Sequence, residues 1–137
     1  MRGVILYIWQ LPQNLLGFLL VYVYYALGMV ARFDGEDGVM YAYVKGVSAG
    51  VSLGRYVVLK ASGIEDGRQK YHEYGHCMQS RFLGPLYLLV IGLPSLIGNI
   101  YDRIAHRSWS YERSYKWYYA QPWEAWADKL GKVIRNE

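Results

Sequence analysis

The chain has 137 residues, enough for one small domain, alone or carrying membrane segments. Apolar residues make up 53% and aromatic residues 17%, a composition typical of proteins at a boundary between water and lipid. The net charge of +4 comes without a long run of Lys or Arg, so we expect no nucleic-acid partner, and a basic surface beside anionic lipid explains the charge.

The first expected element is an apolar membrane helix. No charged residue occurs between Gly3 and Ala31, and the densest apolar part follows the polar break QLPQN. This segment reaches the roughly 20 residues that cross a bilayer as a helix once its flanks are counted. A cleaved signal peptide is the alternative, weakened by the long uncharged stretch, the early Pro12 and the lack of a small-x-small cleavage site. We expect residues 1–32 to form a retained anchor and residues 33–137 the folded domain.

Short strands are expected next. Residues 32–38, RFDGEDG, have the polar, acidic, glycine-containing composition of a loop. Residues 39–60 are rich in β-branched and aromatic side chains and are interrupted by three glycines. This pattern predicts two or three short strands, of which 56–59 is the clearest.

The stretch from Ser62 to Gly84 has the pattern of a helix. Ser62 and Glu65 have the spacing of a capping box, Asp66 is an alternative cap, and Gly84 followed by Pro85 ends the helix. Charged and amide side chains are distributed along it, so this helix is not itself a membrane span.

Residues 82–101 form a second apolar block without charge, just long enough to cross a bilayer. Pro85, Pro94 and three glycines argue against a straight span, which leaves a kinked span, a re-entrant hairpin or a helix lying in the interface. The buried core of a water-soluble protein is the further alternative. Residues 102–121 are basic and aromatic, and suit a surface at the level of lipid headgroups.

The stretch YHEYGH suggests a metal site within the expected helix. His72 and His76 are four residues apart and therefore share a helical face, where both imidazoles can bind one ion. Glu73, one position further round, can reach a water on that ion without being a ligand. A zinc site needs a third ligand. His106 is the only other histidine and lies in an Arg-rich stretch, so Glu124 is the better candidate.

Glu124 belongs to PWEAWADKLG, which predicts a helix that begins at Pro122 and ends near Gly131. Glu124 and Asp128 are four residues apart and share a face. One carboxylate can bind a metal while the other accepts a hydrogen bond from a ligand imidazole. An ordinary solvated pair of acidic residues is the alternative.

The motifs HEYGH and EAWAD together resemble the H-E-x-G-H and E-x-x-A-D pair of gluzincin metallopeptidases. The resemblance is closest to the membrane-bound branch that contains HtpX and the CaaX prenyl proteases, in which a hydrophobic segment separates the two motifs. It implies an α+β fold with a minimal zincin-like core: a short antiparallel sheet, the HExxH helix and a C-terminal glutamate helix. It also implies one Zn²⁺ per chain held by His72, His76 and Glu124, with Glu73 as general base and Asp128 as hydrogen-bond partner of a ligand.

Gly75 matches the small residue of the family motif, where close helix packing would exclude a side chain. The specific matches cover about a dozen residues. They do not identify the residue that stabilises the oxyanion, for which Tyr115, Tyr118, Tyr119 and His106 are the candidates.

These observations predict a membrane-associated zinc endopeptidase that hydrolyses peptide bonds through a zinc-bound water activated by Glu73. The expected partners are a peptide or protein substrate and membrane lipid. One alternative is a zinc-stabilised membrane or interaction protein on the same scaffold without turnover, and another is a small basic membrane protein with a chance motif. The single cysteine, Cys77, excludes an intrachain disulfide and, with the resemblance, favours a site that faces the cytosol.

Overall fold

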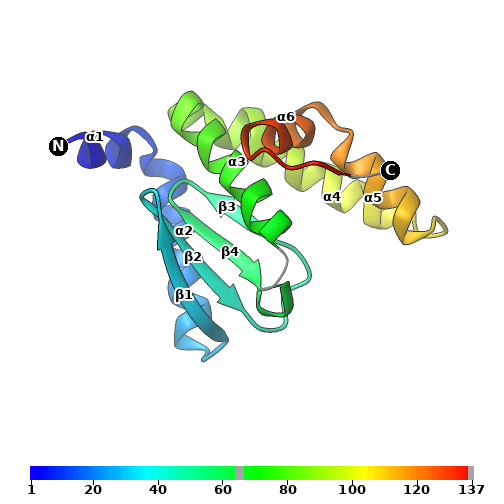
Figure 1. Cartoon of the computed structure of the whole chain (residues 1–137), viewed down its shortest axis with the longest axis horizontal. Helices are drawn as coiled ribbons and strands as arrows, with labels where there is room; N and C mark the ends of the chain where they lie inside the picture. The colour runs from blue at the N-terminus through cyan, green and yellow to red at the C-terminus, as the bar shows by residue number, and fades with distance from the viewer. Residues whose placement is uncertain (64–66, 136–137) are drawn as a thin grey trace.

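The computed structural model describes residues 1–63 and 67–135, and within them the chain is an α+β protein with a four-stranded mixed sheet and six α-helices (Figure 1). The helices are α1 (Arg2–Trp9), α2 (Leu11–Ala26), α3 (Gly67–Leu83), α4 (Leu93–Ala105), α5 (Tyr111–Tyr119) and α6 (Pro122–Leu130). The strands are β1 (Val30–Glu36), β2 (Val39–Val44), β3 (Val51–Leu53) and β4 (Tyr56–Lys60).

The sheet has the order β1-β2-β4-β3. The β1/β2 and β3/β4 pairs are antiparallel, whereas β2 and β4 are parallel, with Met40 opposite Tyr56. The expected purely antiparallel sheet is therefore wrong at its centre. After β2 the chain crosses to the edge of the sheet, where it forms the three-residue β3. It then returns as β4, which lies between β2 and β3 and runs parallel to β2.

A second correction concerns residues 32–38, which were expected to form a loop. They lie mostly in β1, and Asp37 and Gly38 form the turn to β2 with φ of 51° and 74°. Positive φ at both central residues is the geometry of a type I′ hairpin turn, for which Asp-Gly is a favoured pair. The polar composition is explained by position, because β1 is an edge strand with mostly exposed side chains.

Helices cover both faces of the sheet (Figure 1). On one face Tyr41, Val57 and Leu59 pack with Cys77 of α3, and on the other Ala42 and Val58 pack among side chains that include those of α2. This alternation follows from the two-residue period of a strand. Burial on both faces explains why β2 and β4 are almost continuously apolar.

The N-terminal helices meet at a bend of 88° between α1 and α2. Polar side chains at this bend are buried against the end of α3: Gln13 donates to Ser80 Oγ (2.9 Å) and to the Gly84 carbonyl (2.8 Å), and Ser80 donates to Gln10 Oε1 (2.7 Å). The break QLPQN thus fastens α2 to the core, to which Val21 also contributes. The expected role of residues 1–32 as a membrane anchor stays a prediction.

The expected helix with the HEYGH motif is α3. It ends before Gly84 as predicted. The expected cap Ser62 lies in a separate 3₁₀ turn at Ala61–Gly63, while its partner Glu65 and the alternative cap Asp66 lie outside the described residues. The apolar block that follows contains a 3₁₀ turn at Gly84–Leu86 and a π-helical turn at Leu88–Gly92 that runs into α4. Among the described residues, Leu88–Ala105 is the one helix long and apolar enough to cross a membrane, and only 11% of it is buried.

Candidate metal centre

The site lies where α3 crosses α6, and the two helices touch backbone to backbone. A Cβ placed on Gly75 would lie 1.9 Å from the carbonyl oxygen of Ala127, so no side chain fits there. The expectation that Gly75 permits close helix packing is confirmed. This contact brings the inward face of α6, with Glu124 and Asp128, against the histidine face of α3.

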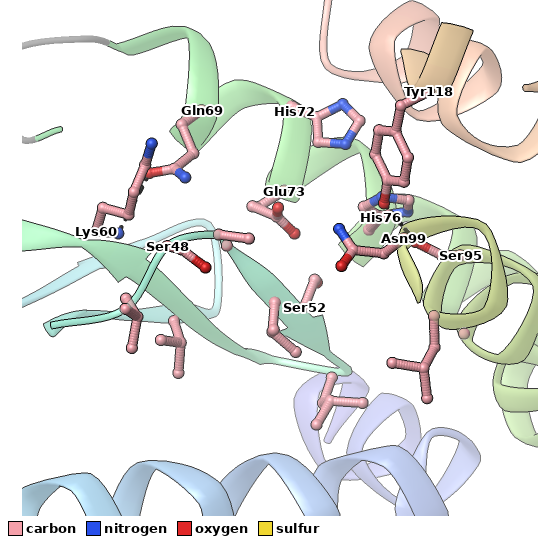
Figure 2. A pocket seen from close by; sticks show the side chains of 18 of the residues that line it. Ser48, Ser52, Lys60, Gln69, His72, Glu73, His76, Ser95, Asn99 and Tyr118 are labelled. Carbon is pink, nitrogen blue, oxygen red and sulfur yellow. Dashed lines mark hydrogen bonds between the residues drawn. The ribbon is translucent and has the colours of Figure 1, made fainter. Parts of the chain in front are cut away.

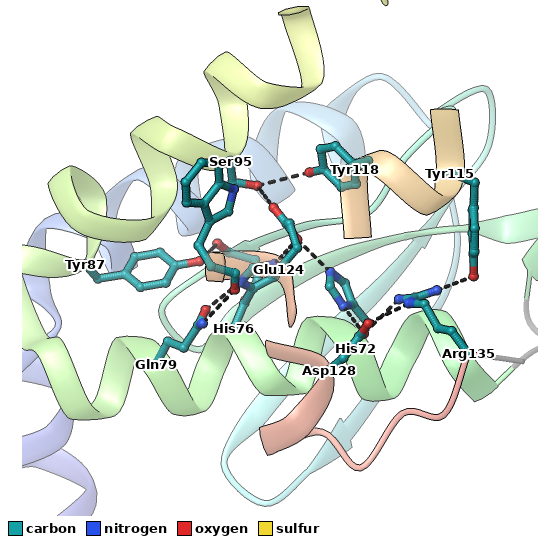
Figure 3. Close-up of polar contacts among 12 residues, drawn as sticks. His72, His76, Gln79, Tyr87, Ser95, Tyr115, Tyr118, Glu124, Asp128 and Arg135 are labelled. Carbon is teal, nitrogen blue, oxygen red and sulfur yellow. Dashed lines mark hydrogen bonds and ion pairs between the residues drawn. The ribbon is translucent and has the colours of Figure 1, made fainter. Parts of the chain in front are cut away.

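Three side chains meet at this crossing, as expected from the two motifs (Figure 3). The Nε2 atoms of His72 and His76 each lie 3.1 Å from Oε2 of Glu124. All three residues are buried, and their ligand atoms lie within 4.8 Å of one another, so the group could hold a metal ion. His106 is elsewhere: its ring stacks on Trp109 at a centroid distance of 3.6 Å.

The outer nitrogen of each imidazole has its own partner, which decides where the ring hydrogen is. Gln79 is fully buried, and its amide nitrogen donates to the carbonyl oxygen of Trp123 (2.9 Å). Because that oxygen can only accept, the amide oxygen of Gln79 must face His76 Nδ1, 2.7 Å away, and Nδ1 must carry the hydrogen. Nε2 of His76 is then left with a free lone pair.

The same holds for His72. Its Nδ1 lies 2.7 Å from Oδ1 of Asp128, and that carboxylate is held by two hydrogen bonds from Arg135, of 2.6 and 2.8 Å. A carboxylate fixed by a guanidinium accepts the Nδ1 hydrogen, so Nε2 of the neutral ring also carries a lone pair. Two imidazole lone pairs and a carboxylate oxygen therefore face one another with no hydrogen between them.

Such a meeting of acceptors requires a positive charge. Burial opposes a charged imidazole, yet hydrogen bonds to Asp128 and Glu124 outweigh it and raise the pKa of His72 to about 9. Burial likewise opposes ionisation of Glu124, but the imidazoles of His72 and His76 beside its carboxylate hold its pKa well below the usual range. Without a metal ion, a proton on His72 supplies the positive charge among the three acceptor atoms.

Glu124 presents only one oxygen to the histidines. Its other oxygen, Oε1, accepts a hydrogen bond of 2.5 Å from Ser95, whose hydroxyl also lies 3.1 Å from that of Tyr118 (Figure 3). Ser95 belongs to α4, so the apolar helix takes part in the site directly. The arrangement favours binding of an ion through a single carboxylate oxygen.

A cavity of about 1130 Å³ opens beside the three side chains, and Glu73, His72 and His76 line it (Figure 2). The Glu73 carboxyl group rests against Gly50, where a Cβ would lie 2.6 Å from Oε1. Burial raises the pKa of Glu73. A carboxyl group of raised pKa beside a cavity is suited to accept and return a proton.

Of the four candidates for oxyanion stabilisation, Tyr115, Tyr118 and Tyr119 line the cavity and His106 does not. Cys77 is buried, lies 3.1 Å from Ser52 Oγ and has its pKa raised by burial to about 12, so it is an unreactive thiol.

Sequence reasoning missed three side chains of the site. Gln79 could have been found, because it lies three residues after His76 and so on the same helical face. Ser95 and Arg135 carry no such signal, since each reaches the site from an element with no motif.

No protein-family model, curated protein or solved structure matches this chain. The functional argument therefore depends on the geometry and chemistry of the site itself.

Proposed function

We propose that this chain is a membrane-associated, zinc-dependent endopeptidase of the gluzincin type, acting on a peptide or protein substrate. The observation that carries this proposal is the meeting of three buried acceptor atoms, from His72, His76 and Glu124, beside a cavity lined by Glu73. Two imidazoles and one carboxylate are a ligand set typical of catalytic zinc, which keeps three protein ligands and one open position.

Zinc, when bound, supplies a Lewis acid that lowers the pKa of water and polarises a carbonyl group. Glu73 takes the proton that the water loses and returns it to the leaving amine, a role for which its raised pKa suits it. Asp128 and Gln79 keep the two imidazoles in the tautomer that binds a metal. Ser95 holds the outer oxygen of Glu124, which keeps that ligand in one orientation.

The proposed association with the membrane is supported by apolar surface. The helix Leu88–Ala105 is long and apolar enough to cross a bilayer, and α1 and α2 expose further large apolar side chains, including Ile5 and Phe18. We propose that the site faces the cytosol, in keeping with the resemblance and with the reduced, buried Cys77.

The proposal is tested by zinc content and proteolysis with the full chain purified in detergent. We expect about one zinc per chain in the wild type and in Glu73→Gln, less in Glu124→Ala, and cleavage of an unfolded protein such as reduced casein by the wild type alone. Folded wild type that was never exposed to a chelator and holds no zinc would refute the metal site. Zinc binding without cleavage would favour the alternative function, a zinc-stabilised membrane or interaction protein on the same scaffold without turnover.

A further inference from the structure

The cavity beside Glu73 is a cleft with two walls. One wall is the chain from Gly46 to Leu53, and the other is the helical stretch from Leu88 to Arg103. By helical rise the second wall is about 22 Å long, which is room for about six residues of an extended chain.

Two hydrogen bonds show how the walls are oriented. The Tyr87 hydroxyl donates to the carbonyl oxygen of Ser52 (3.0 Å), and the Arg103 guanidinium donates to Ser48 Oγ (3.1 Å). The two walls therefore run in opposite directions. Ser52 faces the N-terminal end of the helical wall, and Ser48 faces its C-terminal end. Glu73 touches Gly50 and so lies between the two ends.

The two ends differ in chemistry. At the Ser52 end the cleft is lined by Leu53, Leu88 and Leu93, together with Leu16 of α2. Helix α2 reaches this end because Gly17 packs directly on Leu53, where a Cβ would lie 2.6 Å from the carbonyl oxygen. The lining of this end is apolar.

At the Ser48 end polar side chains join the lining, beside the apolar Val47 and Ala49. Asn99 and Arg103 take the place of leucine on the helical wall, and Lys60 and Gln69 lie with Ser48 on one side of Glu73 (Figure 2). The change from apolar to polar lining falls near Ser95 on the helical wall, and Ser95 is the residue that holds Glu124.

The apolar end is also continuous with the apolar exterior. Side chains on α2 and on the helix Leu88–Ala105 that do not line the cleft are exposed nearby, among them Phe18 at 54% and Leu89 at 67%. An apolar chain segment that enters the cleft from this end passes from one apolar surface to another, without exposure to water.

We propose that the cleft binds a polypeptide segment whose side chains are apolar on one side of the scissile bond and polar on the other. This is the composition of a chain where a membrane-embedded stretch leaves the lipid. The inference depends on the proposed endopeptidase function and names the substrate class of the same site. The cleft selects this class because a polar residue at the apolar end loses its hydrogen bonds to water without replacement.

The experiment uses the zinc-loaded full chain in mild detergent and four fluorogenic peptides of equal length. Two join a Leu/Ala half to a Ser/Asn half, one in each order; the third has the same residues shuffled, and the fourth is Ser/Asn throughout. We expect one of the two junction peptides to be cut at its junction with kcat/KM about ten-fold or more above the shuffled peptide, the factor typical of a pocket that distinguishes single apolar groups.

Matched variants locate the preference in the cleft. Leu93→Gln should reduce the ratio between junction and shuffled peptides, whereas Leu89→Gln, on the same helix but outside the cleft lining, should leave it unchanged. Leu16→Gln and Leu19→Gln on α2 are a second such pair, the first inside the lining and the second outside it, with exposures of 48% and 58%, so a folding defect in one variant does not end the test.

The outcomes separate this inference from the proposed function. Equal cleavage of all four peptides, or a ratio that falls as much in Leu89→Gln as in Leu93→Gln, would overturn the inference and leave the endopeptidase standing. Failure of zinc-loaded protein to cut any peptide or reduced casein would overturn both.

Discussion

The tautomer argument makes Gln79→Met the most informative perturbation of the site. Methionine fills a similar volume but can neither accept the hydrogen of His76 Nδ1 nor donate to the carbonyl of Trp123, which lie 2.7 and 2.9 Å from the glutamine amide. The imidazole is then free to carry its hydrogen on Nε2, the atom that faces Glu124. We expect zinc affinity to fall about 10- to 100-fold, the usual cost of removing the outer partner of a metal-bound histidine.

The same change should destabilise the metal-free protein. A buried donor and a buried acceptor lose their partners, and each such group costs about 1–3 kcal/mol, so the free energy of unfolding should fall by about 2–6 kcal/mol. Gln13→Met is the matched control. Gln13 is also fully buried and also makes two hydrogen bonds, to Ser80 and Gly84, but these do not involve the metal centre.

Competition with a chromophoric chelator measures zinc affinity, and thermal unfolding of the metal-free protein measures stability. Gln13→Met should lower stability and leave zinc affinity unchanged, whereas Gln79→Met should lower both. Equal zinc affinity in wild type and Gln79→Met would refute the assignment of the histidine tautomer. Equal loss in both variants would assign the effect to general destabilisation.

Three further substitutions test other parts of the site. Gly75→Ala puts a Cβ 1.9 Å from the Ala127 carbonyl, so α6 must shift; zinc affinity should fall, and overpacking should cost about 1–3 kcal/mol in thermal unfolding. Gly50→Ala puts a Cβ 2.6 Å from Glu73 Oε1, so kcat should fall about 10- to 100-fold in a casein assay while the zinc content stays at the wild-type level. Asp128→Asn can turn an amide NH₂ toward its histidine and favour the wrong tautomer, so zinc affinity should fall about 10- to 100-fold in the chelator assay.

These three predictions have clear contrary results. Gly98→Ala is the control for the first, because its Cβ would lie 3.7 Å from Trp123, an ordinary contact. Wild-type stability and zinc affinity in Gly75→Ala would mean that the helices do not touch at this glycine. Loss of zinc from Gly50→Ala, or full affinity in Asp128→Asn, would contradict the roles given to Glu73 and Asp128.

The local sequence pattern was sufficient to predict the two helices that carry the motifs. Four-residue spacing put His72 beside His76 and Glu124 beside Asp128, and the structure brings both pairs to one point. The backbone contact at Gly75 came from the resemblance and is confirmed. The four-residue pairings follow from helical geometry, which is the same for any sequence once a helix is formed.

The sheet was harder to predict because its order depends on tertiary packing. No local signal states that β4 inserts between β2 and β3, although burial of β2 and β4 on both faces is typical of strands with a parallel neighbour. The polar composition of β1 hid an edge strand, and the Asp37-Gly38 turn was the signal that could have revealed it. Arg135 was beyond sequence reasoning, since it reaches Asp128 from the C-terminal tail.

Charge balance explains why a divalent ion suits this centre better than a proton. Glu73, Glu124 and Asp128 are buried carboxyl groups within one electrostatic neighbourhood, and Arg135 is the cation paired with them, so full ionisation leaves two negative charges. One proton on His72 removes only half of that excess, and burial separately raises the pKa of Glu73. A divalent cation at the three acceptors neutralises the whole set and lets both imidazoles stay neutral.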